Sequence, residues 1–147
     1  MVRVRDLVPD DAVELTALYG EYGWWADREV EGVRRALANT DVAVGIEAGE
    51  DGDLVAAARV LTDRTYYANV FDVVVAAERR GEGLGARLLE AVVDHPDLRS
   101  VVGVSLLCRQ GLVPFYGSVG FERHDGEVEL PEGGTGDLVR MTYRTGR

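Results

Sequence analysis

A chain of 147 residues with 46% hydrophobic residues is long enough to bury a core as one domain, residues 1–147, without a metal ion or a disulfide. Its one cysteine, Cys108, excludes an intrachain disulfide, and its net charge of −10 argues against a nucleic-acid-binding surface, which would be basic. No apolar run is long enough to span a membrane and the N-terminus is charged from Arg3 onwards, so we expect no membrane span, no secretory signal and a cytoplasmic location.

The charged residues carry a second signal. All 16 basic residues are arginines, because the sequence contains no lysine. An acidic excess without lysine resembles halophilic proteins, whose acidic surfaces stay soluble in concentrated salt; a GC-rich genome that favours arginine codons is the alternative. His95 and His124 have no partner at metal-ligand spacing, so we expect no metal site.

The first forty residues predict one strand and two helices. Residues 2–7 alternate apolar and charged side chains, which is typical of a strand. Pro9-Asp10-Asp11 then favours a helix start. The apolar face of this helix is expected to contain Leu15, Leu18, Tyr19 and Tyr22. After a break at Gly23, Asp27 can cap a second helix. Its apolar face is expected to contain Val30, Val33 and Leu37.

The rest of the chain is richer in strands. Residues 41–48 and 54–61 predict a hairpin, and a third strand follows at about residues 66–75. The later elements are expected to be a helix that ends before Pro96, a strand at 100–107, a short helix at 113–119 that Gly120 terminates, and two strands around a glycine-rich turn within 121–144. The order β-α-α-β-β-β-α-β-α-β-β predicts a mixed α/β (α+β) domain with helices packed on one sheet.

A glycine-rich loop separates the third central strand from the next helix. Gly81, Gly83 and Gly85 remove Cβ atoms at alternate positions, which lets a ligand approach the main chain closely. The first turn of the helix also points unpaired N–H groups and the positive end of its dipole at such a ligand. These features favour a phosphate or pyrophosphate site, and a flexible turn with solvated arginines is the alternative. A basic patch lies beside the loop: Arg79, Arg80 and Arg87.

Two other phosphate-binding motifs fit the loop less well. A P-loop needs a lysine after its last glycine, and this chain has none. Residues 81–86 do satisfy the dinucleotide fingerprint G-x-G-x-x-A. Against that interpretation, residues 76–80 separate the strand from the first glycine, the preceding strands form hairpins rather than βαβ units, and no acidic residue ends the next strand.

The stretch Arg80-Gly81-Glu82-Gly83-Leu84-Gly85 resembles the acyl-CoA-binding signature of the GNAT (Gcn5-related) N-acetyltransferases, an Arg or Gln followed by x-x-Gly-x-Gly or Ala. The resemblance extends downstream to Val113–Glu122, which is similar to the family's FYxxxGF helix-to-strand element. The order of elements is also that of the family, so the resemblance covers nearly the whole chain. It implies the GNAT fold, a mixed, mostly antiparallel central sheet of about seven strands flanked by about four helices.

The resemblance also implies where an acyl donor, acetyl-CoA, binds. The pyrophosphate would lie on the loop amides beside Arg80; these are the amides of Gly81, Glu82, Gly83, Leu84, Gly85 and Ala86. The pantetheine arm would pair like an extra strand with the end of the third central strand, at Val73, Val74 and Val75. An asparagine that often precedes the family's Phe-Tyr motif by six residues is replaced here by Arg109.

Catalytic roles follow from the same resemblance. Tyr116 matches the tyrosine that protonates the departing CoA thiolate, and the amide of Val75 or a neighbour would polarise the thioester carbonyl. Asp72 interrupts an apolar strand, so it either helps to deprotonate the amine or pairs structurally, for instance with Arg59. Ordered water is the alternative base. An acyl-cysteine route through Cys108 lacks a histidine nearby in sequence.

The segment between the first two helices commonly walls the acceptor site in this family. Here it carries Tyr22, Trp24 and Trp25, and exposed aromatic side chains favour a binding wall, whereas packing over the core is the alternative. We therefore expect an N-acetyltransferase that acts on a primary amine of a small molecule or peptide by direct attack in a ternary complex, with a homodimer as a candidate assembly. The alternative is a non-catalytic GNAT-fold CoA-binding sensor or interaction module.

Overall fold

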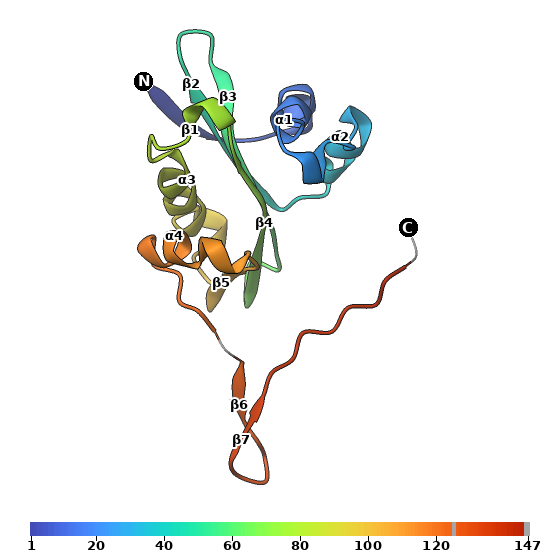
Figure 1. Cartoon of the computed structure of the whole chain (residues 1–147), viewed down its shortest axis with the longest axis vertical. Helices are drawn as coiled ribbons and strands as arrows, with labels where there is room; N and C mark the ends of the chain where they lie inside the picture. Colours follow the sequence, from blue (N-terminus) through green and yellow to red (C-terminus); the bar gives the residue numbers. More distant parts are fainter. Residues whose placement is uncertain (125, 146–147) are drawn as a thin grey trace. The chain divides into compact units, whose positions relative to one another are not determined.

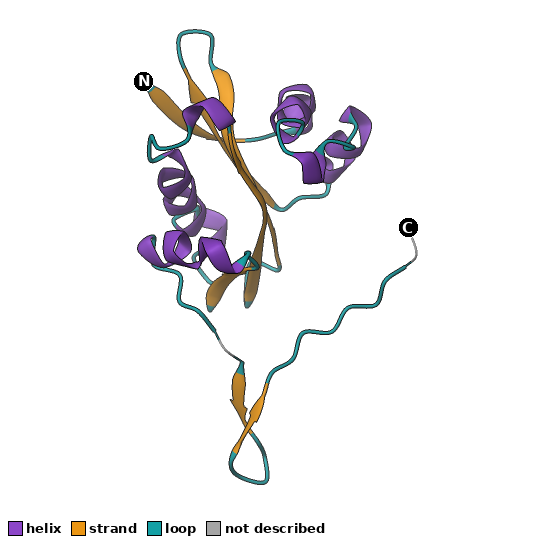
Figure 2. Cartoon of the chain, viewed as in Figure 1, coloured by secondary structure: helices purple, strands orange, loops and turns teal. Residues whose placement is uncertain are grey.

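The computed structural model describes residues 1–124 and 126–145, and the chain divides into two compact units, Met1–Cys108 and Arg109–Arg147. The first unit consists of a five-stranded sheet with helices on both of its faces (Figures 1 and 2). The second unit contains a short helix and a two-stranded sheet. The predicted mixed α/β class is confirmed.

The sheet of the first unit is mixed and mostly antiparallel. Its strands are β1 (Val2–Asp6), β2 (Val42–Ala48), β3 (Asp53–Thr62), β4 (Tyr67–Val75) and β5 (Gly103–Leu106), in the order β1-β2-β3-β4-β5. The first four pair antiparallel, and β5 pairs parallel to β4. Because parallel neighbours need a crossover connection, the chain between β4 and β5 passes through a helix on one face of the sheet.

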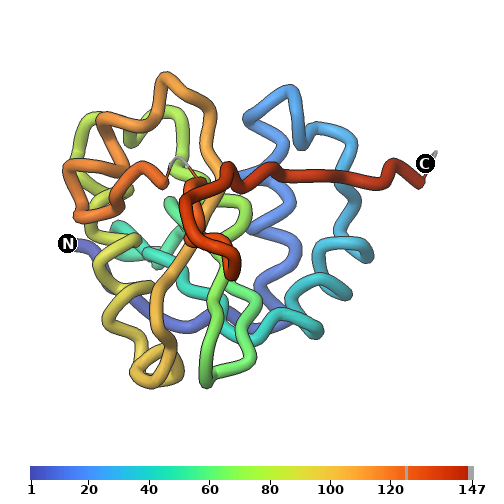
Figure 3. The backbone as a smooth tube through the Cα atoms, turned by 90° about the horizontal axis from the view of Figure 1, so that it is seen from below, coloured from blue at the N-terminus to red at the C-terminus, as the bar shows by residue number. Residues whose placement is uncertain are grey.

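The helices lie in two groups. On one face are α1 (Ala12–Tyr19) and α2 (Val30–Ala38), with the short 3-10 turns η1 (Pro9–Asp11) and η2 (Gly23–Trp25). The opposite face carries α3 (Leu84–Val93), between η3 (Ala77–Arg79) and η4 (Pro96–Leu98). Figures 1 and 3 show α3 across the sheet from α1 and α2 in two perpendicular views. The connection from β4 to α3, which contains the glycine loop, therefore leaves the sheet at the end of β4.

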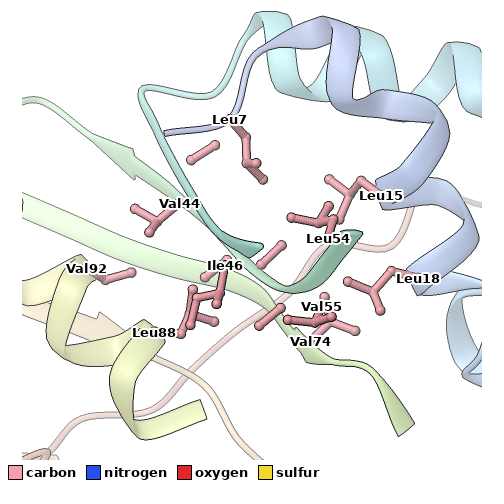
Figure 4. Packing of buried hydrophobic residues seen from close by; sticks show 14 of the residues in the cluster. Leu7, Leu15, Leu18, Val44, Ile46, Leu54, Val55, Val74, Leu88 and Val92 are labelled. Atoms are coloured by element: carbon pink, nitrogen blue, oxygen red, sulfur yellow. The ribbon is translucent and has the colours of Figure 1, made fainter. Parts of the chain in front are cut away.

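Leucine and valine side chains fix both helix groups to the sheet. Leu15 and Leu18 of α1 approach the sheet from one side, and Leu88 and Val92 of α3 approach it from the other (Figure 4). All four are buried, as is Ile46 of β2 between them. Burying an aliphatic side chain of this size stabilises a fold by about 1.5–3 kcal/mol. These contacts fix α1 and α3 to opposite faces of the sheet.

The second unit begins with η5 (Gln110–Leu112) and α4 (Val113–Ser118), followed by the hairpin β6 (Glu127–Glu129) and β7 (Thr135–Asp137). The sequence predicted one sheet of about seven strands. The structure forms the seven expected strands but distributes them as five and two, because β6 and β7 pair only with each other among the described residues.

One helix start was predicted wrongly. Asp27 does not cap the second helix, which begins at Val30 with Glu29 in the N-cap position. The reason is the 3-10 turn at Gly23–Trp25. A further turn follows it, closed by the hydrogen bond from the Arg28 N–H to the Trp25 carbonyl, and Asp27 lies within this turn.

Two findings concern the described residues as a whole. None of the helices in residues 1–124 and 126–145 combines the length and the hydrophobicity that crossing a bilayer requires. Within the same residues, no cluster of three or more His, Cys, Asp or Glu side chains is arranged to hold a metal ion.

Candidate functional site

β4 pairs with two strands at its beginning but with one strand at its end. β3 pairs with β4 as far as Val75, but β5 pairs only with Tyr67–Val70. The N–H of Ala76 donates to the Val55 carbonyl of β3, 2.8 Å away. The backbone N–H and C=O groups of successive residues in a strand point to opposite edges. Since the Ala76 N–H points to β3, the N–H and C=O of Val75 point to the other edge, with which β5 does not pair here. This is the edge at which an extended ligand could pair.

A bulge precedes this segment. The register between β3 and β4 shifts between Ala57 and Arg59, and Asp72 on the bulged strand has φ = 55°, in the left-handed region. Few residues other than glycine adopt that conformation, and bulges of this kind change the direction of a side chain. Here the bulge places a carboxylate, whose side chain is only 12% exposed, directly before Val73.

Two arginines hold the Asp72 carboxylate. Arg59 donates to Oδ2 from Nε (3.0 Å) and Nη2 (2.7 Å), and Arg28 donates to Oδ2 from Nη1 (2.9 Å) and to Oδ1 from Nη2 (3.3 Å). Burial by itself would raise the pKa of Asp72, but the hydrogen bonds and charges of Arg28 and Arg59 outweigh it and hold the pKa below its ordinary value. The structural pairing with Arg59 that the sequence left open is therefore present. A carboxylate held in this way accepts a proton less readily, and its role as a base stays a prediction.

The glycine loop has the open backbone that the sequence predicted. Gly81 (φ = 83°) and Gly83 (φ = 79°) are left-handed, and a Cβ added at either would meet no heavy atom within 4 Å. Gly83 is the N-cap of α3, and no side chain caps this helix end. The amides of Leu84, Gly85 and Ala86 form the first turn, whose N–H groups have no acceptor within the helix. The geometry suits an anion that lies against the main chain.

Arg80 is held by an aromatic side chain. Its Nε donates to the hydroxyl of Tyr22 (3.1 Å), and its guanidinium lies over the Tyr22 ring, 4.9 Å from the centroid. The Tyr22 hydroxyl in turn donates to the Val75 carbonyl at 2.5 Å. The structure thus joins Tyr22 to two predicted site residues, Val75 and Arg80, that lie 53 and 58 residues away in sequence. Glu82 forms a more exposed pair with Arg79, at 3.3 Å.

The three predicted acceptor-side aromatics differ in exposure. Tyr22 is buried, Trp25 is half-buried, and Trp24 is 58% exposed. Their rings are neighbours: the centroids of Tyr22 and Trp24 are 5.2 Å apart, and those of Trp24 and Trp25 are 5.6 Å apart. The guanidinium of Arg28 lies over the Trp25 ring, 5.4 Å from its centroid. Trp24 is therefore the member of the group that offers its surface to a ligand.

Tyr116 belongs to the second unit. It lies in α4, is buried, and packs edge-on against Phe115 (5.0 Å between centroids) and Phe121 (6.0 Å). Its carbonyl accepts the amides of Val119 and Phe121, which closes α4 where Gly120 turns the chain. The Phe-Tyr motif thus forms a compact helix-to-loop element.

Sequence reasoning missed two residues that contact the site. Arg28 binds Asp72 from 44 residues away, and the Glu21 carboxylate accepts the Ala77 N–H at 2.8 Å from 56 residues away. Both side chains look like ordinary surface charges in the sequence. Local spacing carries no signal for either contact, because each depends on how α1 and η2 lie against β4.

The known proteins that this chain resembles include acetyltransferases. Residues 30–141 match the model of the acetyltransferase (GNAT) domain family. A histone acetyltransferase of Glycine max, TAP1, is 29% identical over 121 residues, which cover 76% of this chain and 52% of the relative. Glucosamine 6-phosphate N-acetyltransferase 1 of Oryza sativa subsp. japonica is 35% identical over 101 residues, 65% of this chain and 61% of the relative.

The solved structures add a fold comparison. A GNAT-family protein of Xanthomonas campestris pv. campestris superposes with a TM-score of 0.69 and 29% identity, and the match covers 84% of this chain and 86% of that one. The curated relatives are longer proteins, since this chain spans only about half of the length of the soybean acetyltransferase.

Proposed function

Because this chain belongs to the GNAT acetyltransferase family, we propose that it transfers the acetyl group of acetyl-CoA to a primary amine. The observation that carries the proposal is the combination of an open glycine loop at the start of α3 with the edge of β4 at Val73–Val75, with which β5 does not pair. The first suits a diphosphate and the second suits an extended pantetheine arm, and coenzyme A contains both.

The donor would lie along the main chain. The pyrophosphate accepts hydrogen bonds from the N–H groups of residues 81–86, as the family motif implies. The pantetheine amides pair with the edge of residues 73–75. The thioester carbonyl then comes opposite the amide of Val75, which points to that edge. An N–H aimed at the carbonyl oxygen stabilises the negative charge that develops there during attack.

The reaction is a direct transfer. The nitrogen of a neutral amine attacks the thioester carbon, and the electron pair of the carbonyl moves to its oxygen. When the tetrahedral intermediate collapses, the C–S bond breaks and the thiolate takes a proton from the hydroxyl of Tyr116, assigned by its place in the Phe-Tyr motif. The amine gives up a proton as the amide forms. We assign its removal to water, because the hydrogen bonds of Arg28 and Arg59 lower the pKa of the Asp72 carboxylate and so make it a weaker base. The proton that the amine loses to solvent balances the one that Tyr116 gives to the thiolate, and Tyr116 is reprotonated from solvent.

The acceptor would approach at Trp24. An exposed indole beside Tyr22 offers a flat surface to an aliphatic amine and attracts its cationic form before deprotonation. The relatives named above differ in acceptor by name, one a histone acetyltransferase and the other a glucosamine 6-phosphate acetyltransferase. The proposal therefore extends to a primary amine of a small molecule or peptide. The cytoplasmic location, the halophilic surface and a homodimer remain predictions from composition and family.

A panel of amines, scored by release of free thiol from acetyl-CoA at low and high salt, tests the activity. Tyr116→Phe should lower kcat by roughly 100-fold or more, the scale of general acid catalysis, and leave the Kd for coenzyme A unchanged. Tyr143→Phe, at a side chain that is 90% exposed, is the matched control and should behave as wild type. Binding of coenzyme A without thiol release from any amine would favour the non-catalytic sensor, and wild-type kcat in Tyr116→Phe would remove the assigned acid.

A further inference from the structure

Two consecutive peptide groups at the junction of β4 and the glycine loop are held by side chains from the turn that follows α1. The carbonyl of Val75 accepts the Tyr22 hydroxyl (2.5 Å), while the N–H of the same peptide group, on Ala76, donates to Val55 (2.8 Å). The N–H of the next peptide, on Ala77, donates to the carboxylate of Glu21 (2.8 Å). The chain is thus fixed at each peptide where it leaves the sheet.

The same tyrosine also fixes the motif arginine. A phenol has one proton, and because Tyr22 gives it to Val75, the oxygen is left to accept from the Nε of Arg80 at 3.1 Å. The ring supports the guanidinium from below at 4.9 Å. Tyr22, which is itself buried, therefore joins the last residue of the strand to the first residue of the signature.

The junction needs such support because its other constraints are weak. β5 ends its pairing at Val70, so β3 alone holds the end of β4, and the bulge at Asp72 interrupts even that ladder. Beyond the junction, Gly81 and Gly83 have a conformational freedom that must be lost when a ligand is bound. A loop held in its binding conformation before the ligand arrives binds it more tightly.

We propose that Glu21 and Tyr22 form a junction clamp, a pair of positioning residues that holds the end of β4, the start of the glycine loop and Arg80 in the arrangement that binds the acyl donor. This inference rests on the proposed function, because it assumes that the loop binds acyl-CoA. It gives Tyr22 a role on the donor side, through its hydroxyl, in addition to the packing of its ring against Trp24.

Tyr22→Phe tests the clamp, since phenylalanine keeps the ring under Arg80 and removes only the hydroxyl. We expect the Kd for coenzyme A, measured by calorimetry, to rise about five- to tenfold, the loss of roughly one hydrogen bond's net contribution. The KM for acetyl-CoA should rise by about the same factor, because the hydroxyl holds the main chain that binds the donor. Tyr143→Phe is the control and should bind as wild type.

Glu21 provides a second, independent pair of variants. Glu21→Ala removes the acceptor for the Ala77 N–H, whereas Glu21→Gln keeps a carbonyl oxygen in its place. We expect Glu21→Ala to weaken coenzyme A binding and to speed hydrogen exchange at the Ala77 amide in the ligand-free protein, and Glu21→Gln to restore both. A purely structural residue would lower the melting temperature without a selective change at the loop.

The outcomes separate the two proposals. If wild type binds coenzyme A and both Tyr22→Phe and Glu21→Ala bind it equally well, the clamp is wrong and the proposed function stands. If wild type binds no coenzyme A, the proposed function fails and the clamp fails with it. If Tyr22→Phe does not fold, the comparison of Glu21→Ala with Glu21→Gln decides: equal affinity for coenzyme A overturns the clamp, and a rescue by glutamine supports it.

Discussion

Two regions flank the valine run of β4, and they are built in opposite ways. On one side, the Asp72 carboxylate is largely buried and accepts hydrogen bonds from Arg28 and Arg59, so its polar atoms are satisfied by the chain itself. On the other side, Gly81 and Gly83 leave the main chain open, with no heavy atom where a Cβ would lie. The first arrangement stabilises the strand, whereas the second leaves hydrogen-bonding groups for a ligand.

The difference predicts how each region responds to substitution. Changes at the Asp72 cluster should appear mainly in the free energy of unfolding, because they leave partly buried charges without partners. Changes at the glycine loop should appear mainly in acyl-donor binding, because the loop contributes few contacts to the core. Four experiments address this contrast, and the clamp lies between the two regions.

The largest effect is expected for Asp72→Ala. It leaves two guanidinium groups, 17% and 33% exposed, without their carboxylate, and we expect a loss of about 2–4 kcal/mol in the free energy of unfolding, measured with urea. Glu31→Ala, which breaks the exposed pair of Glu31 with Arg34, is the control and should change stability by less than about 0.5 kcal/mol. Equal effects of the two variants would mean that the cluster is no more stabilising than a surface ion pair.

Asp72→Asn sharpens the same comparison by asking whether the carboxylate also has a catalytic role. If water is the base, the folded variant should keep kcat within about tenfold of wild type, because asparagine preserves the shape of the side chain. A loss of kcat as large as that of Tyr116→Phe, with coenzyme A still bound, would assign the base to Asp72 instead.

An intermediate effect is expected for Gly83→Ala. Left-handed backbone disfavours alanine by roughly 1–2 kcal/mol, and the added methyl group occupies the space in which the pyrophosphate would lie. Gly49→Ala is a matched control, because Gly49 has the same φ of 79° and the same open surroundings, but lies in the hairpin between β2 and β3. Both variants should lose similar stability, whereas only Gly83→Ala should weaken coenzyme A binding, by about tenfold or more. Equal binding by the two would exclude the loop as the diphosphate site.

The smallest effect is a pH dependence. The pKa of Asp72 in the folded protein lies below the unfolded value of about 3.9, so its stabilising contribution is present above that value and is lost as the pH falls towards the folded pKa. Asp11, beside Arg5, behaves in the same way. From pH 5 to 3, the stability of wild type should therefore fall more steeply than that of Asp72→Ala, by at most about 1.4 kcal/mol per pH unit. Parallel curves would show that Asp72 is not stabilised in its charged form.

Much of the fold could be predicted from the sequence. The alternation of Val2–Leu7, the hairpin around residues 49–53 and the glycine loop before α3 are local patterns, and the structure has each of them in place. The exposed and the packed tryptophan could not be distinguished, because Trp24 and Trp25 are adjacent in a 3-10 turn and only the surrounding layer decides which ring turns inward. The division of the strands into five and two also depended on pairing partners distant in sequence.

By itself, the sequence determined where the main chain is open, because three glycines before a helix have that consequence in almost any context. Only the tertiary structure decided what surrounds that opening. Arg28 reaches Asp72, and Glu21 and Tyr22 reach the end of β4, across 44 to 56 residues of chain. Such contacts form because the buried faces of α1 and the sheet bring those backbones together, and a side chain that hydrogen-bonds across that distance leaves no periodic trace in the sequence.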